Sequence, residues 1–470
     1  MLRKICSYLL YVISFNLVIS IPAVAQQKSA IKTLAQRQQD FIDLRFGMFI
    51  HYNIPTYMDQ DWADPEASPA IFDPKKLDCN QWADAAKSAN MSYGCLTTKH
   101  HSGFAIWNTK TTAYNVMNSP LKRDVVKEYT DAFRAKGLKV MLYYSILDTH
   151  HKLRPNSITP AHIKMVKAQL TELLSNYGEI DALIIDGWDA PWSRISYDEV
   201  PFEEIYKLVK SLQPNCLFMD LNAAKYPSEA LYYTDIKSYE QNAGQHIAKD
   251  SNKLPALSCL PLQATWFWKT NSPNEILKDP VKLVNDNIIP MNNASCNFIL
   301  NVAPNRDGLI DENALKSLAA IGKIWKNEGP LAKLPVLDAP LIAHNLAKKQ
   351  VSNSSWSDDM DIMDFANDDD FKTAWVSNPT VKTPWYELSF PSEKSFNAIV
   401  IAEKQENIQH YKLEYFSKGV WKELFNGSNR KNIKIHRFPR VSGTKVRIVI
   451  DQALKAPKIN EFQVYNELKD

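Results

Sequence analysis

The amino-acid sequence predicts an α/β chain, with a (β/α)8-like TIM barrel followed by an all-β sandwich. From about residue 40 to 330, short apolar runs alternate with amphipathic segments, which is typical of strands joined by crossover helices. Polar residues follow the ends of these apolar runs, where a barrel gathers functional groups on one face. After Trp325 the helical pattern stops, and short alternating apolar and polar runs continue to the C-terminus.

The first 25 residues have the composition of a secretory signal peptide. Arg3 and Lys4 precede an apolar run from Tyr8 to Ile21, and a small-residue cleavage pattern ends at Ala25. The interrupted run and the cleavage pattern argue against a membrane anchor, and no later stretch reaches the roughly 20 apolar residues of a membrane span. We therefore expect cleavage near Ala25 and a periplasmic or secreted protein that does not span the membrane.

The barrel is expected over residues 26–335. Seven apolar runs predict strands at Phe46–His51, Tyr93–Thr98, Leu138–Tyr144, Asp181–Asp186, Cys216–Asp220, Leu231–Asp235 and Asn297–Val302. Amphipathic segments predict helices at Leu77–Ala89, Asp124–Lys136, Ile163–Asn176, Phe202–Leu212 and Glu312–Lys326. Seven or eight such units in one domain favour a closed barrel over an open sheet.

Prolines mark the end of the barrel domain. Pro330, Pro335 and Pro340 punctuate a stretch that predicts a linker over residues 336–348. Residues 349–470 predict the sandwich, because their apolar residues alternate with polar ones in short runs. The expected strands include Trp385–Phe390, Ala398–Ala402, Tyr411–Phe416, Lys445–Ile450 and Glu461–Tyr465.

Composition excludes one class of partner and suggests another. The formal net charge is +3, and no dense run of Lys or Arg follows the signal peptide, so nucleic acid is not an expected partner. The chain contains 12 Trp and 20 Tyr, whose flat rings line sugar-binding clefts as well as protein cores.

Asp186 is the first candidate catalytic residue. It follows the apolar run 182–185 and precedes Gly187, so a carboxylate lies where a buried strand opens into a turn. An Asp-Gly pair also forms ordinary turns, and the dipeptide alone does not decide between the two interpretations. Cleavage of a glycosidic bond with retention requires a second carboxylate nearby. The candidates near the following strand ends are Asp220, Glu229, Asp235 and Glu240.

Three histidines follow the first two predicted strands. His51 ends one strand, and His100 and His101 follow the next. Neutral imidazoles are good hydrogen-bond partners for sugar hydroxyls, although the same histidines with Asp186 could also hold a catalytic metal ion. A barrel metal hydrolase would more usually show His-x-His on one strand, and this pattern is absent, so we expect no metal at the site.

Six segments and their order indicate a family. They are Phe46–His51, Thr98–Trp107, Gly137–Ser145, Ile180–Gly187, Asp235–Glu240 and Asn297–Gly308. Together they resemble the motif series of α-L-fucosidases, glycoside hydrolase family 29. The resemblance covers about residues 35 to 328 and includes the acid/base segment of the family branch that uses Glu.

The resemblance implies a retaining exo-glycoside hydrolase that releases α-L-fucose from a fucosylated oligosaccharide or glycoconjugate without a cofactor. It implies Asp186 as the nucleophile and Glu240 as the general acid/base. The implied sugar contacts are His51, His100, His101 and Tyr144, with Trp62 as a hydrophobic wall. Trp266 belongs to an aromatic cluster after a barrel strand, where it is expected to flank the sugar.

The sequence departs from the family at several sugar-contact positions. Tyr52 and Asn53 replace the usual Trp-Gly after His51. Ser102 replaces a customary Asp, and Ile184 stands where a Trp often occurs. These differences leave two alternatives open, a glycan-binding protein of the same fold with altered catalysis and a hydrolase for a related sugar such as α-L-galactose.

Two C-terminal segments, Ala366–Trp375 and Trp385–Leu388, resemble a discoidin or coagulation factor 5/8 type module. Modules of this kind often hold a structural calcium ion through an acidic loop, and oxygen ligands suit calcium. The Asp-rich run Asp368–Asp370 therefore predicts a possible structural calcium site, beside its interpretation as an ordinary turn.

Overall fold

The computed structural model describes residues 30–227, 230–336, 344–357 and 360–467. The predicted signal peptide, residues 337–343 of the predicted linker and the acid/base candidate Glu229 lie outside these ranges. Within the ranges, no helix combines the length and the hydrophobicity that a membrane span requires.

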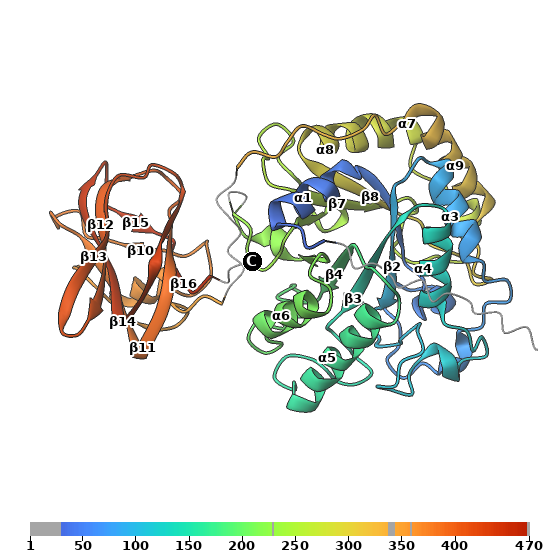
Figure 1. Ribbon diagram of the computed structural model, residues 1–470, viewed down its shortest axis with the longest axis horizontal. Helices are drawn as coiled ribbons and strands as arrows, with labels where there is room; N and C mark the ends of the chain where they lie inside the picture. The colour runs from blue at the N-terminus through green and yellow to red at the C-terminus, as the bar shows by residue number, and fades with distance from the viewer. Residues whose placement is uncertain (1–29, 228–229, 337–343, 358–359, 468–470) are drawn as a thin grey trace, which may run out of the picture. The chain divides into compact units, whose positions relative to one another are not determined.

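Eight parallel strands form a nearly closed barrel (Figure 1). They are β1 (Phe46–Ile50), β2 (Tyr93–Lys99), β3 (Lys139–Ser145), β4 (Ala182–Asp186), β5 (Leu217–Asp220), β6 (Lys237–Glu240), β7 (Ala256–Pro261) and β8 (Cys296–Asn301). Hydrogen bonds join them in the order β5-β4-β3-β2-β1-β8-β7-β6. Because β1 pairs in parallel with both β2 and β8, the first and last strands meet. The predicted barrel is confirmed.

Helices connect the strands and cover the sheet (Figure 1). The longer ones are α1 (Leu34–Asp43), α3 (Cys79–Ser88), α4 (Val125–Ala135), α5 (Pro160–Ser175), α6 (Phe202–Leu212) and α9 (Glu312–Ile324), and the shorter ones are α2 (Pro55–Met58), α7 (Pro280–Lys282) and α8 (Ile289–Asn293). Asp78, Asp124 and Thr159 accept backbone N–H groups in the first turns of α3, α4 and α5, which fixes where these helices begin.

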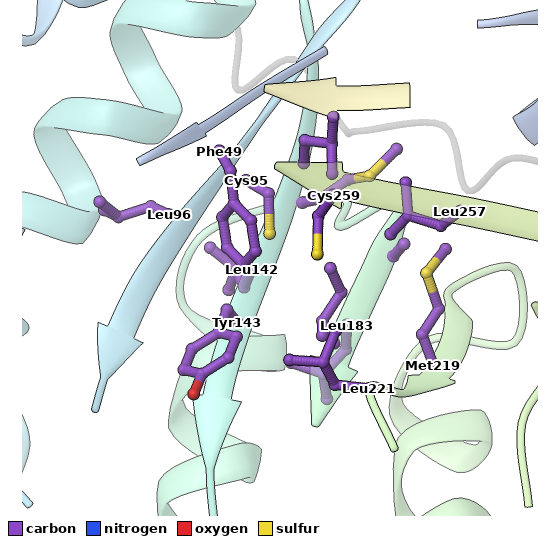
Figure 2. Packing of buried hydrophobic residues seen from close by; sticks show 14 of the residues in the cluster. Phe49, Cys95, Leu96, Leu142, Tyr143, Leu183, Met219, Leu221, Leu257 and Cys259 are labelled. Atoms are coloured by element: carbon purple, nitrogen blue, oxygen red, sulfur yellow. The ribbon is translucent and has the colours of Figure 1, made fainter. Parts of the chain in front are cut away.

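Side chains fill the barrel interior. Figure 2 shows Phe49 of β1, Cys95 of β2, Tyr143 of β3 and Cys259 of β7 from this core, together with Leu183 of β4, which lies on the other face of its strand. All five are buried. A parallel barrel packed in this way leaves the carboxyl ends of its strands as the place for a functional site.

The predicted strand at Leu231–Asp235 is wrong, because β6 begins only at Lys237. Tyr233 has a φ of 54°, in the left-handed region that interrupts an extended strand. The segment nevertheless supplies hydrogen-bond partners to the backbone groups at the edge of β5. The Asp235 N–H donates to the Phe218 carbonyl, and the Asp235 carboxylate accepts the Phe218 N–H at 2.8 Å. A side chain thus replaces one of the carbonyl groups of a normal ladder. β7 has no counterpart among the predicted strands.

The C-terminal domain is an antiparallel β-sandwich, as predicted. Its strands are β9 (Val351–Ser354), β10 (Trp375–Val376), β11 (Trp385–Ala402), β12 (Ile408–Ser417), β13 (Val420–Gly427), β14 (Ile433–Ala453), β15 (Lys458–Ile459) and β16 (Glu461–Tyr465). The larger sheet has the order β13-β12-β14-β11-β16, with β9 also paired to β11, and β10 pairs with β15. Trp375, Tyr386, Leu413 and Ile448 belong to its buried core.

The acidic loop of this domain has the contacts of a turn. The Asp368 carboxylate accepts the Thr373 hydroxyl at 3.0 Å and the Asp370 N–H at 2.8 Å. Asp369 forms an ion pair with Lys348 at 3.3 Å. Over the part of the chain that the structure describes, no group of three or more His, Cys, Asp or Glu side chains is arranged to hold a metal ion. In this arrangement the carboxylates of Asp368 and Asp369 bind other groups of the protein. Calcium binding stays a prediction.

Candidate active site

A cavity of about 420 Å³ opens at the carboxyl ends of the barrel strands. The structure brings seven of the predicted site residues to its wall, namely His51, Trp62, His100, His101, Asp186, Glu240 and Trp266. The wall also contains Phe49, Tyr143, Asp61 and Trp192. Residues from strands far apart in the sequence therefore meet in one place, as the barrel fold requires.

Asp186 ends β4 with its carboxylate held by two donors. The Tyr143 hydroxyl donates to Oδ2 at 2.6 Å, and the Asn222 amide donates to Oδ1 at 3.0 Å. Tyr143 reaches this carboxylate because Ser145 of β3 is the register partner of Asp186 and Tyr143 lies two residues earlier on the same face. Burial raises the pKa of Asp186 to about 6, while the two hydrogen bonds oppose the rise by favouring the anion.

Asp220 holds Asn222 in position. Its Oδ1 accepts the Asn222 backbone N–H at 2.9 Å, and its other oxygen accepts the Tyr197 hydroxyl. Asp220 is fully buried and lies outside the cavity wall, although burial raises its pKa to about 7. This carboxylate supports the donor to Asp186 and is not itself placed to meet a ligand.

Glu240 is the last residue of β6 and the second carboxylate of the cavity wall. Burial raises its pKa to about 7, and the neighbouring charge of Asp186 adds to the rise, while a hydrogen bond from the Trp266 side chain opposes it. The cavity thus contains two interacting carboxyl groups with different environments, one held as an acceptor and one favoured in its protonated form.

His51 has a defined tautomer. The Asn301 amide nitrogen donates to the Trp266 carbonyl at 2.8 Å, which turns Oδ1 of Asn301 towards Nδ1 of His51 at 2.7 Å. Nδ1 therefore carries the proton and Nε2 is an acceptor. Burial lowers the pKa of His51 to about 3, so the ring is neutral at ordinary pH.

His100 and His101 are also neutral. Ser145 donates its hydroxyl proton to the Leu147 carbonyl at 3.0 Å, so its oxygen accepts Nδ1–H of His101 at 2.8 Å. Nε2 of His101 lies 3.8 Å from Oδ2 of Asp186. Burial lowers the pKa of His101 to about 3 and that of His100 well below its usual value. Nδ1 of His100 has no hydrogen-bond partner among the described residues. Because all three imidazoles are neutral, they suit a neutral polar ligand.

A buried ion pair lies at the start of the loop that carries the two histidines. The Lys99 ammonium lies 3.2 Å from the Asp148 carboxylate, and both side chains are fully buried. Burial alone would raise the pKa of Asp148, but the charge of Lys99 and the contact with His151 outweigh it and lower the pKa to about 2. At Gly103, with φ of 90°, a Cβ atom would lie 2.1 Å from Oδ1 of Asp148, so only glycine allows this close turn.

Comparison with known proteins identifies the family. Residues 66–330, more than half of the chain, match the family model described as Alpha-L-fucosidase. The chain belongs to the alpha-L-fucosidase family. Residues 348–462 match the model of the F5/8 type C domain, which confirms the resemblance of the C-terminal region to a discoidin module. The family assignment also confirms the prediction of a glycoside hydrolase.

Alignments with individual relatives of the fucosidase family cover most of the chain. It is 26% identical over 458 residues to Alpha-L-fucosidase 1 of Arabidopsis thaliana, covering 89% of this chain and 84% of that protein. It is 25% identical over 467 residues to Putative alpha-L-fucosidase 1 of Oryza sativa subsp. japonica, covering 93% and 85%. The crystal structure of a glycoside hydrolase 29 family member from an unknown rumen bacterium matches with 25% identity and a TM-score of 0.53, covering 94% of this chain and 78% of that one.

Besides Asp220, two of the described residues considered for this fucosidase-family site lie elsewhere. Tyr144, predicted to contact the sugar, donates its hydroxyl to Gln169 at 2.6 Å and lies outside the cavity wall. Side chains alternate along β3, so Tyr143 faces the cavity in its place. Asp235, an alternative acid/base, is buried against Lys210 at 2.6 Å and also lies outside the wall.

The wall and support residues that the sequence prediction missed include Tyr143, Asn222 and Trp192. Tyr143 is placed on the face of Asp186 only by the pairing of Ser145 with Asp186, a register that the sequence does not specify. Asn222 follows a predicted strand end, but its amide carries no signal by itself. Trp192 lies in the loop after β4, where no periodic pattern indicates which side chain returns to the cavity.

Removing the Tyr143 hydroxyl should move the titration of Asp186. Tyr143→Phe deletes a donor that favours the carboxylate, so the pKa of Asp186 should rise and the acid limb of the kcat/KM profile should move to higher pH. We expect kcat/KM to fall by about tenfold or more near neutral pH. The matched control is Tyr144→Phe, one residue away, which should leave the acid limb in place. The opposite result would restore Tyr144 as the functional tyrosine.

Proposed function

We propose that this protein is a retaining exo-glycoside hydrolase that releases α-L-fucose from fucosylated oligosaccharides or glycoconjugates by double displacement. The supporting observation is that one cavity contains Asp186 and Glu240, with pKa values raised to about 6 and about 7. Retention needs one ionised and one protonated carboxyl group beside the glycosidic bond. The names of the relatives support fucose as the sugar.

In the first step, Asp186 attacks the anomeric carbon while the bond to the leaving oxygen breaks. Tyr143 and Asn222 hold the attacking carboxylate in one orientation. The proton of Glu240 passes to the leaving oxygen, so the aglycone departs as a neutral alcohol. The product is a covalent glycosyl-enzyme on Asp186.

In the second step, water takes the place of the departed aglycone. Glu240, now ionised, accepts a proton from the water as its oxygen bonds to the anomeric carbon. The bond to Asp186 breaks, and both carboxyl groups return to their starting states. No metal ion or organic cofactor is needed for this sequence of steps, which uses only the two carboxyl groups and water.

The sugar pocket combines neutral imidazoles with aromatic walls. His51, His100 and His101 are suited to the hydroxyl groups of a fucose ring, because a neutral imidazole nitrogen can accept a hydroxyl proton. Trp62 and Trp266 offer apolar ring faces to its carbons. We further propose that the mature protein acts in the periplasm or outside the cell after cleavage near Ala25, on the basis of the signal-peptide pattern.

Retention can be observed directly in the first product. Proton NMR of freshly mixed enzyme and 4-nitrophenyl α-L-fucoside should show α-L-fucose before the β-anomer, which then forms by mutarotation. Two successive displacements at the anomeric carbon restore the starting configuration. If β-L-fucose forms first, the enzyme inverts and the nucleophilic role of Asp186 is wrong.

The pH dependence of kcat/KM should be a narrow bell. Below a pKa of about 6, protonation of Asp186 removes the nucleophile, and above about 7, ionisation of Glu240 removes the acid. The maximum should lie between these two values, and each limb should fall about tenfold per pH unit. Initial rates on a fucosylated disaccharide from pH 4 to 9 test this, and a plateau extending past about pH 8 would contradict the assignment of Glu240.

A further inference from the structure

A second cavity of about 260 Å³ lies beside the catalytic one. Trp62 and Trp192 line both cavities, so these two side chains form the shared wall. Their ring centroids are 5.3 Å apart in an edge-to-face arrangement. They are 45% and 42% exposed, which leaves ring surface free for a ligand. We call this pair the tryptophan wall.

The tryptophan wall is tied to the catalytic residues through His101. The ring of His101 lies 4.5 Å from that of Trp62 and 4.3 Å from that of Trp192, measured between centroids. The His101 carbonyl also accepts the backbone N–H of Thr149, which lines the second cavity. The tryptophan wall therefore lies between the second cavity and His101, whose Nε2 faces Asp186. Because the two cavities share the tryptophan wall, a substrate longer than one sugar can extend from the catalytic cavity into the second one.

The second cavity has polar groups with unused hydrogen-bonding capacity. Thr149 and Ser193 line it, and the hydroxyl oxygen of each is buried without a hydrogen-bond partner among the described residues. Buried hydroxyl groups of this kind cost free energy unless a partner is supplied, and a short side chain can redirect its oxygen by a rotation about χ1. A hydroxyl-rich ligand would supply that partner.

Arg154 gives this cavity its charge. It is the single charged residue among those that line the cavity, and its side chain is exposed. Over the described residues, its guanidinium has neither an ion pair nor a side-chain hydrogen bond. A free guanidinium fork beside an aromatic wall is suited to a carboxylate or a sulfate, which it can bind through two parallel N–H donors.

We propose that the second cavity binds the sugar to which the fucosyl group is attached, and that Arg154 selects aglycones with an anionic substituent. The ring of the aglycone sugar packs on the tryptophan wall, and its hydroxyls meet Thr149 and Ser193. The substituent, a carboxylate or a sulfate ester, binds Arg154. This inference rests on the proposed fucosidase function, since it names the aglycone of the same reaction.

The test compares three fucosylated disaccharides that differ only in the aglycone sugar, which is neutral, carries a carboxylate, or carries a sulfate ester. The wild-type enzyme should show a kcat/KM about tenfold higher on at least one anionic substrate than on the neutral one. Arg154→Gln should bring this ratio to about one. The preference should also weaken as salt is raised, because Arg154 is exposed. The anionic substrate that the wild-type enzyme prefers identifies the substituent that Arg154 binds.

Arg194→Gln is the matched control, because Arg194 is an exposed arginine of the same region that lies outside both cavities. It should keep the wild-type ratio. A ratio near one in the wild-type enzyme, or the same ratio in wild type and Arg154→Gln, overturns the inference while leaving the fucosidase proposal intact. Failure of the wild-type enzyme to release L-fucose from any disaccharide and from 4-nitrophenyl α-L-fucoside overturns the proposed function itself.

Discussion

Asp186→Asn is expected to lower kcat/KM for 4-nitrophenyl α-L-fucoside by a factor on the order of 10³ or more. The substitution keeps the size of the side chain but removes the nucleophilic oxygen anion. The loss should be severe for substrates with good and poor leaving groups alike, because the attack of Asp186 belongs to the same step in which either leaving group departs. Initial rates on the two classes of fucoside measure this directly.

Replacing Asp186 by a smaller residue distinguishes loss of the nucleophile from loss of the fold. Asp186→Ala leaves space beneath the anomeric carbon, where added azide can attack in place of the carboxylate. The expected product is β-L-fucosyl azide, formed by one displacement with inversion. An unchanged melting temperature, measured alongside, would show that the barrel is intact. Activity of Asp186→Asn within tenfold of wild type would mean that another group is the nucleophile.

The positions of the main site residues followed from the strand ends. Asp186 and His51 come at the close of strongly apolar runs, and in a barrel such ends meet on one face. What the sequence could not provide was the exact side-chain direction along β3. The pairing of β2 with β3 shifts its register between Thr97 and Lys99, so the choice between Tyr143 and Tyr144 depends on geometry that a short apolar run does not specify.

The missed and misplaced strands have related causes. Leu231–Asp235 is apolar and buried like a strand, but its hydrogen bonds to β5 come partly from side chains, as with Asp235 and Phe218. β7 lies between Pro255 and the final Pro261, which breaks the expected pattern of a central strand. Burial is visible in composition, whereas the partner of each backbone group is decided only in the folded chain.

Glu240→Gln should produce a defect that depends on the leaving group. For a fucosylated disaccharide, kcat/KM should fall by about 10² to 10⁴, because the alkoxide then leaves without a proton. For 2,4-dinitrophenyl α-L-fucoside, kcat/KM should stay within about tenfold of wild type, since this phenolate leaves unaided. The alkaline limb of the pH profile should disappear in the variant, because the group with the pKa of about 7 has been removed.

The same variant should also expose the second half of the reaction. With the activated substrate, the first step stays fast while water attacks the glycosyl-enzyme without a general base, so kcat and KM should both fall and a burst of dinitrophenol should appear. Asp235→Asn is the informative comparison, because Asp235 is a candidate acid/base from the same part of the barrel that lies outside the cavity wall. Its carboxylate is buried against Lys210, so its loss should lower the melting temperature without changing the leaving-group dependence. A leaving-group effect in Asp235→Asn and none in Glu240→Gln would transfer the acid/base role to Asp235.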